Sequence, residues 1–296
     1  MSHKLDSYSL MIVSKYFRTI YDFINAEFVC KKFQGNMEKF HYNPITLLKE
    51  TRQYFPNIET LYIYERNHYR FTDGKIAGYV VWYQVDYDIS LIEEKNNCIC
   101  KNISYSHHNQ LIHDKLPVNI SNIEFKCFCD SSISSIEIPL QVTKLGIFSF
   151  LRCSNLTSVQ MGNAVTEISE SCFSFCVVLK TITLSQRLLT LGNNAFSHCY
   201  NLPTIQLPNS LNNIGTYTFN YCTQLSSIDI PQLLTQIPCR CFDHCISLSS
   251  VVLPPNCSLI CPYAFSTCSN LVSINLKDVK TVEENAFFGS LQFTIQ

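Results

Sequence analysis

The stretch that decides the fold is "NNIGTYTFNYCTQLSSIDIP" (residues 212–231), which follows "LTLGNNAFSHCYNLPTIQLP" (residues 189–208) at an offset of 23 residues. When the two are laid over each other, a phenylalanine, a cysteine and three aliphatic residues coincide, with Phe219 falling under Phe196. A fixed offset of this kind indicates a structural repeat, in which each copy needs its neighbours to bury its apolar side chains.

Five rows of residues keep this register through the C-terminal half of the chain. The three aliphatic rows are Ile136, Val159, Ile182, Ile205, Ile228, Val251 and Ile274; Ile138, Met161, Leu184, Leu207, Ile230, Leu253 and Leu276; and Ile133, Leu156, Leu179, Leu202, Leu225, Leu248 and Leu271. The aromatic row is Phe150, Phe173, Phe196, Phe219, Phe242, Phe265 and Phe287, and the thiol row is Cys153, Cys176, Cys199, Cys222, Cys245 and Cys268.

Each copy can be divided into two walls. The pattern L-x-x-I-x-L is typical of a short strand whose inward side chains alternate with outward ones. In several copies a proline follows and ends the strand, at Pro139, Pro208, Pro231 and Pro254. An aliphatic pair such as Leu188 and Leu191 comes next, and then the turn that carries the phenylalanine. We expect this turn to be helical and to form the wall opposite the sheet.

This pattern resembles the leucine-rich repeat of the BspA type, most clearly in "IGTYTFNYCTQLSSIDIP" (residues 214–231). The resemblance covers roughly residues 123–287. It implies a curved solenoid with a parallel sheet on its concave face. The predicted fold class is therefore an α/β solenoid of leucine-rich repeats, preceded by a small helical cap and a β-hairpin insertion.

Three segments are expected along the chain: a helical N-terminal cap at residues 1–54, degenerate first repeats at 55–122 and the repeat array at 123–296. In the middle segment, Ile58, Leu61 and Ile63 repeat the strand pattern out of step with the later copies. After them, Asp73-Gly74 lies between two runs rich in β-formers, which predicts a hairpin.

The N-terminal cap is predicted from helical spacing of its apolar residues, as in Leu10, Val13 and Phe17. Asn43 followed by Pro44 has the form of an N-cap and a first helical position, so a further helix is expected to begin there.

The cap also resembles an F-box, a helical unit that docks to a Skp-type adaptor in ubiquitin ligases. It departs from that pattern in lacking a Leu-Pro opening and in having Phe33 where tryptophan is common. The resemblance implies that residues 1–45 bind such an adaptor. Its residues are Leu10, Val13, Tyr16, Phe17, Asp22, Phe23, Ala26, Val29, Cys30, Lys31 and Phe33.

The chain contains sixteen cysteines, six of them in the thiol row. Because free cysteine behaves as a small, commonly buried apolar residue, we expect these thiols to be reduced and packed in the core. The pairs Cys98-x-Cys100 and Cys127-x-Cys129 leave open a zinc site. The spacing of residues points to no catalytic group, cofactor or metal, so packing in the core is the preferred interpretation of the cysteines. We therefore expect a protein that is not an enzyme.

Composition bounds the partners and the location. Hydrophobic residues make up 46% of the chain and charged residues 15%, with a net charge of −1. This charge gives no electrostatic reason to expect nucleic acid as a partner. The N-terminus has no secretory apolar run and the chain no apolar stretch of membrane-spanning length, so a cytoplasmic protein is predicted. The cell surface remains the alternative location, because the chain contains four Asn-x-Ser/Thr sequons, which are glycosylation acceptors in secreted proteins. They begin at Asn102, Asn119, Asn155 and Asn256.

Function is expected on the exposed face of the sheet, because varying side chains on a fixed scaffold can encode recognition. One outward row is polar and nearly uncharged, which suits a protein or peptide partner: Glu137, Gln160, Thr183, Gln206, Asp229, Val252 and Asn275. The sequence therefore predicts a protein-interaction scaffold. A ubiquitin-ligase substrate adaptor and, from the BspA resemblance, a cell-surface adhesin are the alternatives.

A last expectation concerns residues 288–296, which follow the final phenylalanine of the array. We expect this segment either to cover the last strand or to mark a contact between two chains, because an open stack exposes apolar side chains and a strand edge.

Overall fold

The computed structural model describes residues 5–113 and 115–290. Its contacts divide the chain into two compact units, residues 1–103 and 104–296. The expectation for residues 288–296 lies mostly outside the described residues, and the division into three segments stays a prediction.

The first unit begins with helices α1 (Ser7–Ser14) and α2 (Ile20–Val29). Short 3-10 helices follow at Lys31–Phe33, Met37–Lys39 and Arg52–Tyr54. The helical stripe is confirmed in part. Leu10 is buried, and Phe23 packs edge-to-face on Phe40 and Phe55 with ring centroids 5.9 and 5.3 Å away. Val13 and Phe28, in contrast, are 45% and 82% exposed.

The helix expected after Asn43 does not form, and residues 44–50 contain no helical residue. The Asn43 side chain instead bonds to a strand: its amide donates to the Tyr62 carbonyl at 2.8 Å, and its oxygen accepts from the Tyr62 amide at 2.6 Å. The side chain that was expected to cap a helix thus binds a strand residue 19 positions later in the chain. Local spacing does not reveal such a long-range contact.

The remaining elements of the first unit are β1 (Thr60–Ile63), β2 (Gly78–Val81), β3 (Val85–Asp86), α3 (Tyr87–Lys95) and β4 (Cys98–Cys100). The expected hairpin is wrong. Gly74 does occupy a turn with φ of +73°. The strands on either side of it, β1 and β2, nevertheless pair in parallel, and β2 pairs in parallel with β4. This segment winds in the same sense as a solenoid instead of folding back.

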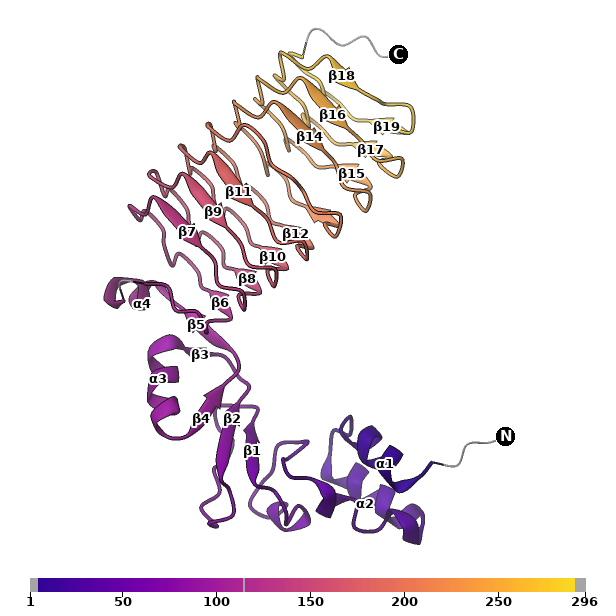
Figure 1. Cartoon of the computed structure of the whole chain (residues 1–296). Helices are drawn as coiled ribbons and strands as arrows, with labels where there is room; N and C mark the ends of the chain where they lie inside the picture. Colours follow the sequence, from indigo (N-terminus) through magenta and orange to yellow (C-terminus); the bar gives the residue numbers. More distant parts are fainter. Residues whose placement is uncertain (1–4, 114, 291–296) are drawn as a thin grey trace. The chain divides into compact units, whose positions relative to one another are not determined.

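The second unit contains the repeat array, which is a β-solenoid (Figure 1). After β5 (Ile103–Tyr105) and α4 (His107–Ile112), each copy contributes to two columns of parallel strands. The wide ladder consists of three-residue or shorter strands: β7 (Ser135–Glu137), β9 (Ser158–Gln160), β11 (Thr181–Thr183), β14 (Ser227–Asp229), β16 (Ser250–Val252) and β18 (Ser273–Ile274).

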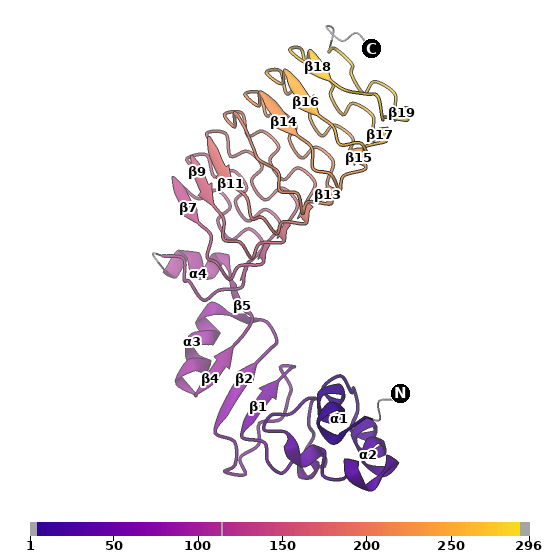
Figure 2. The same ribbon diagram turned by 45° about the vertical axis from the view of Figure 1, so that its right-hand side comes forward.

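The narrow ladder consists of two-residue strands, each of which ends with the second residue of an aliphatic pair. They are β6 (Asn122–Ile123), β8 (Lys144–Leu145), β10 (Glu167–Ile168), β12 (Thr190–Leu191), β13 (Asn213–Ile214), β15 (Gln236–Ile237), β17 (Leu259–Ile260) and β19 (Thr281–Val282). Pairing follows the sequence repeat, as in Ile136 opposite Val159 and Leu191 opposite Ile214. Figure 2 shows both columns running along the array.

The turn that carries the phenylalanine forms the opposite wall, which we call the turn wall. The helical turn predicted there is wrong: the described turns are non-helical, and the residues two before and two after the phenylalanine have left-handed backbones, as in Tyr217 and Tyr221 around Phe219 (φ 58° and 57°). The predicted aromatic spine is confirmed. From Phe128 to Phe287 successive rings stack with centroids 5.0–5.6 Å apart and planes within 8°.

Candidate functional site

The predicted recognition row lies on one face of the wide ladder, and all seven of its side chains are exposed. Register brings them side by side, with Glu137 opposite Gln160, Gln160 opposite Thr183, and Asp229 opposite Val252. The aliphatic residues next to them point the other way, as in buried Val159 and Ile228. The row is therefore a line of accessible, varied side chains on a fixed backbone.

The wide ladder is interrupted in the middle of this row. It forms one sheet of β7, β9 and β11 and a second of β14, β16 and β18. The copy between them, Thr204–Leu207, forms no strand. Among the described residues none offers a backbone hydrogen bond to these four, although Ile205 and Leu207 are only 6% and 8% exposed.

Pro203 accounts for the interruption on the side of β11. In the other copies, the residue at this position donates its amide hydrogen to the preceding copy, as Lys180 does to the Thr157 carbonyl (2.9 Å) and Ser249 to that of Ser226 (2.9 Å). Proline has no amide hydrogen, so this bond is lost where the strand should begin.

Pro238 does the same to the narrow ladder, which divides between β13 and β15. The residues at the equivalent position in the flanking copies donate to the preceding copy: Gly215 to the Leu191 carbonyl at 2.8 Å, and Cys261 to that of Ile237 at 3.0 Å. The narrow ladder is therefore open between the copy that contains Thr204 and the copy that contains Ser227, and the wide ladder is open on both sides of Thr204–Leu207. Between the Thr204 and Ser227 copies, the Ser226 amide still donates to the Pro203 carbonyl at 3.1 Å, where the wide strand would begin.

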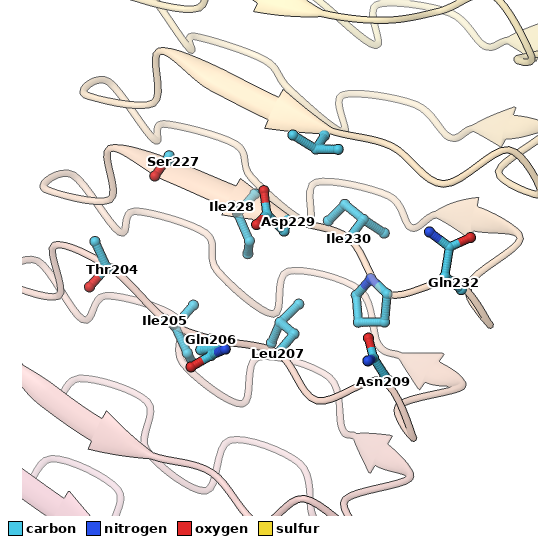
Figure 3. A pocket seen from close by; sticks show the side chains of 12 residues that line it. Thr204, Ile205, Gln206, Leu207, Asn209, Ser227, Ile228, Asp229, Ile230 and Gln232 are labelled. Carbon is cyan, nitrogen blue, oxygen red and sulfur yellow. The ribbon is translucent and has the colours of Figure 1, made fainter.

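A pocket of about 470 Å³ occupies this step. Figure 3 shows its lining, which comes from the two copies that face each other across the interruption and from Val252 of the next copy. Exposed polar side chains of the recognition row, Gln206 and Asp229, lie beside aliphatic ones that elsewhere close the core, such as Leu207 and Ile230. We call this pocket, with Thr204–Leu207 and Ser227–Ile230 as its sides, the ladder gap.

The two prolines that account for the gap were missed from sequence, although a signal exists. Pro139, Pro208, Pro231 and Pro254 share one position after the strand and fit the repeat. Pro203 and Pro238 stand alone at their positions, where other copies have residues with an amide hydrogen. Both prolines can be found in the sequence as residues without an amide hydrogen at positions where the repeat needs a backbone donor.

The turn wall stays closed at the same step. Tyr217, Phe219 and Tyr221 donate their amide hydrogens to the carbonyls of Cys239, Cys241 and Asp243, at 3.1, 2.9 and 2.9 Å. The rings of Phe219 and Phe242 stack at 5.4 Å. The two copies are thus joined along the turn wall, whereas along the wide strand the bond from the Ser226 amide to the Pro203 carbonyl is the only backbone bond that joins them among the described residues.

The thiol row is fully buried and has a hydrogen-bonding role that the sequence did not predict. Each thiol donates to the carbonyl of a phenylalanine in an earlier copy, as Cys222 does to Phe196 (3.2 Å) and Cys245 to Phe219 (3.1 Å). In the last copy a serine takes this position, and the Ser290 hydroxyl donates to the Phe265 carbonyl at 2.7 Å. All sixteen cysteines lie among the described residues, and all are free thiols.

A second stack lies on the outer side of the turn wall, where Phe175, His198, Tyr221 and His244 follow one another with ring centroids 4.1–4.8 Å apart. Tyr221 separates the two histidines. Across residues 5–113 and 115–290, no group of three or more His, Cys, Asp or Glu side chains is arranged to hold a metal ion. Neither Cys98 and Cys100 nor Cys127 and Cys129 belong to such a group among these residues. Burial raises the pKa of the Cys98 thiol to about 11.

The helices were also compared with the length and apolar character that a membrane span requires. In the part of the chain that the structure describes, none meets both requirements.

The model of the BspA type leucine rich repeat region matches residues 90–203 and 166–294, with six copies. Among solved structures, a leucine-rich repeat protein from Bacteroides ovatus is 28% identical over 55% of this chain, with a TM-score of 0.52, and the match covers 43% of that protein. This chain thus spans less than half the length of that relative. The leucine-rich repeat protein of T. pallidum is 23% identical over 58% of this chain and 78% of its own, with a TM-score of 0.49. No curated protein matches. Because the family model accounts for more than half of its residues, the chain belongs to the family of BspA-type leucine-rich repeat proteins.

Proposed function

We propose that this chain is a non-enzymatic scaffold that binds a protein or peptide through the recognition row of the wide ladder. One observation carries this proposal: seven side chains at one repeat position are all exposed, while the aliphatic side chains beside them on the same strands are largely buried. Such a row has fixed spacing and variable chemistry, which are the properties of a recognition surface.

The row suits a hydrogen-bonding partner better than a charged polymer. Only Glu137 and Asp229 carry charge, and both are acidic, so the row would repel a polyanion. The amide and hydroxyl groups of Gln160, Thr183 and Gln206 can donate and accept hydrogen bonds. A protein surface or an extended peptide fits this chemistry.

The test compares two exposed aliphatic residues that lie on different faces. Val252 belongs to the recognition row and is 60% exposed, whereas Leu189 precedes the narrow ladder and is 42% exposed. The tagged full chain should be purified from its own cells, with co-purifying proteins quantified by mass spectrometry. We expect Val252→Arg to reduce the principal partner at least fivefold and Leu189→Arg to leave it unchanged. Equal retention by both variants would place binding elsewhere.

A second function, that of a substrate adaptor for a ubiquitin ligase, is favoured by the surface of α1 and α2. Tyr16, Tyr21, Phe28 and Val29 are 81%, 71%, 82% and 72% exposed. Exposed aromatic side chains grouped on neighbouring helices are typical of a docking surface. Phe28→Asp should remove a Skp-type adaptor from the co-purified proteins without affecting the partner that Val252→Arg removes.

Both of these functions place the protein in the cytoplasm. A surface adhesin is the alternative, and three of the four sequon asparagines, Asn119, Asn155 and Asn256, are exposed and could accept glycans. Labelling of intact cells with an impermeant biotin reagent separates the two locations. Labelled, glycosylated protein would favour the adhesin and count against the adaptor.

A further inference from the structure

The ladder gap leaves backbone groups of the array without partners inside the fold. Leu207 and Ile205 are nearly buried, and in the part of the chain that the structure describes neither makes a backbone hydrogen bond. Buried backbone groups are almost always paired, because an unpaired one loses its hydration without compensation. An interruption at one step of an otherwise regular ladder therefore offers donors and acceptors to a ligand that can supply a main chain.

The side chains around the gap indicate what kind of chain would fit. Leu207 and Ile230 give the pocket an apolar floor, and its volume of about 470 Å³ accommodates a side chain larger than a methyl group. Among the described residues of the lining, Asp229 alone carries a charge. Gln206 and Gln232 add amide groups at its sides. The lining thus combines an apolar site with a neighbouring negative charge.

We propose that the ladder gap binds an extended peptide segment of a partner protein, which pairs through its main chain with Thr204–Leu207. An aliphatic side chain of the segment fills the pocket, and an adjacent lysine or arginine contacts Asp229. Pairing of an added strand with an unpaired edge is a general mode of peptide recognition, in which the main chain supplies affinity and alternate side chains supply specificity. This inference rests on the proposed function. It places the main peptide-binding part of the recognition row at Gln206 and Asp229.

The inference can be tested by replacing the two prolines, which should restore the missing backbone hydrogen bonds of the ladders. Pro203→Ser introduces the residue found at the same position in two later copies, and Pro238→Gly the residue found in three earlier ones. Pro203→Ser regains an amide hydrogen that faces the copy of Thr181, and Pro238→Gly regains one that faces the copy of Thr204, so the double variant should restore both ladders. Asp229→Asn removes the charge alone. Leu189→Ala is the control, because Leu189 is exposed outside the recognition row and outside the lining of the pocket.

The probes come from a random twelve-residue peptide display library selected on the immobilised full chain. We expect enrichment of an aliphatic residue next to lysine or arginine. By calorimetry with the synthetic consensus peptide in about 0.15 M salt, affinity should fall at least tenfold for the double variant and several-fold for Asp229→Asn. It should stay within twofold for Leu189→Ala. A peptide methylated on alternate backbone nitrogens should bind the wild-type chain at least tenfold more weakly, a readout that does not depend on how any variant folds.

Three results would overturn the inference. The first is a library that yields no enriched peptide. The second is unchanged affinity, either of the selected peptides for the repaired variant or of their methylated forms for the wild-type chain. The third is binding that depends on Gln160, as measured with Gln160→Ala, instead of on Asp229. The last result would leave the proposed function standing and move its centre to the intact ladder. Loss of the partner in Val252→Arg cells combined with no peptide enrichment would likewise preserve the scaffold and reject the gap.

Discussion

The turn wall and the sheet wall of the array behave differently at the step between the copy of Thr204 and the copy of Ser227. Along the turn wall, Phe219 stacks on its neighbours, and the amides of Tyr217, Phe219 and Tyr221 donate to carbonyls in the next copy. Along the sheet, both ladders end. The wall with regular strands is thus the one that is interrupted, and the wall without regular secondary structure is continuous.

This difference teaches which interactions hold the copies together. A two- or three-residue strand makes few hydrogen bonds, and the net contribution of each is only about 0.5–1.5 kcal/mol. A buried phenylalanine removes much more apolar surface from water and gains stacking in addition. The array therefore tolerates a proline in a ladder, whereas a gap in the aromatic spine would remove its main source of cohesion.

The largest expected effect comes from alkaline pH, which acts on the buried thiols behind the turn wall. Burial raises the pKa of Cys199, Cys222 and Cys245. An unfolded thiol has a pKa of about 8.5. The stabilisation is complete below that value and is lost as pH rises toward the folded-state pKa, by up to about 1.4 kcal/mol per thiol and pH unit. Urea unfolding at pH 7.5, 9 and 10 should show the loss.

The control is Cys222→Ala, whose pH slope should be shallower by one proton. A urea midpoint that is constant from pH 8 to 10 would show that the thiols are not protected by the fold. A thiol reagent at pH 8 should label few cysteines in the native chain and nearly all sixteen after unfolding without reductant. A large shortfall after unfolding would reveal disulfides and favour the cell surface.

The next effect compares the walls directly through Phe219→Ala and Thr183→Ala. Phe219 is fully buried, so its truncation should lower the free energy of unfolding by about 3–5 kcal/mol. Thr183 is exposed on the wide ladder, and its truncation should cost less than about 0.5 kcal/mol. Chemical denaturation measures both. Similar losses in the two variants would contradict the division into a cohesive wall and a tolerant one.

A smaller effect separates the packing of a thiol from its hydrogen bond. Cys222→Ala removes the thiol donor of the Phe196 carbonyl, which keeps the Cys199 amide as its other donor, and should cost about 0.5–1.5 kcal/mol. Cys222→Ser retains a donor, as Ser290 does naturally in the last copy, and should cost less. Thermal unfolding of the two variants gives the comparison. If serine is more damaging than alanine, apolar packing and not the hydrogen bond decides the residue at this position.

The smallest effect is local and concerns the opening of the sheet without unfolding of the array. The amides of Ile205 and Leu207 should exchange with solvent deuterium at least about tenfold faster than those of Phe196 and Phe219, which have carbonyl partners on the turn wall. Mass spectrometry of peptides from residues 200–210 and 216–224 measures this. Equal protection would mean that the ladder is closed in solution.

The sequence by itself determined the repeat, its register and its core. Side chains at a constant offset must occupy equivalent places in stacked copies, so Phe150–Phe287 could only form a spine and the aliphatic rows could only face inward. The exposure of the recognition row followed from the same alternation, because successive side chains of a strand point to opposite faces. What the row binds is a proposal that neither the offset nor the exposure decides.

Only the tertiary structure decided the features that depend on partners distant in the chain. Asn43 has the local form of a helix cap, yet its amide bonds to Tyr62 on β1. Asp73-Gly74 has the local form of a hairpin, yet β1 and β2 on either side of it pair in parallel, so the chain between them crosses over instead of folding back. The ladder gap is of the same kind. Pro203 and Pro238 lie 35 residues apart in sequence. The amide hydrogen missing at Pro203 would face the copy of Thr181, and the one missing at Pro238 would face the copy of Thr204. Only stacking places these two losses in adjacent steps of the array.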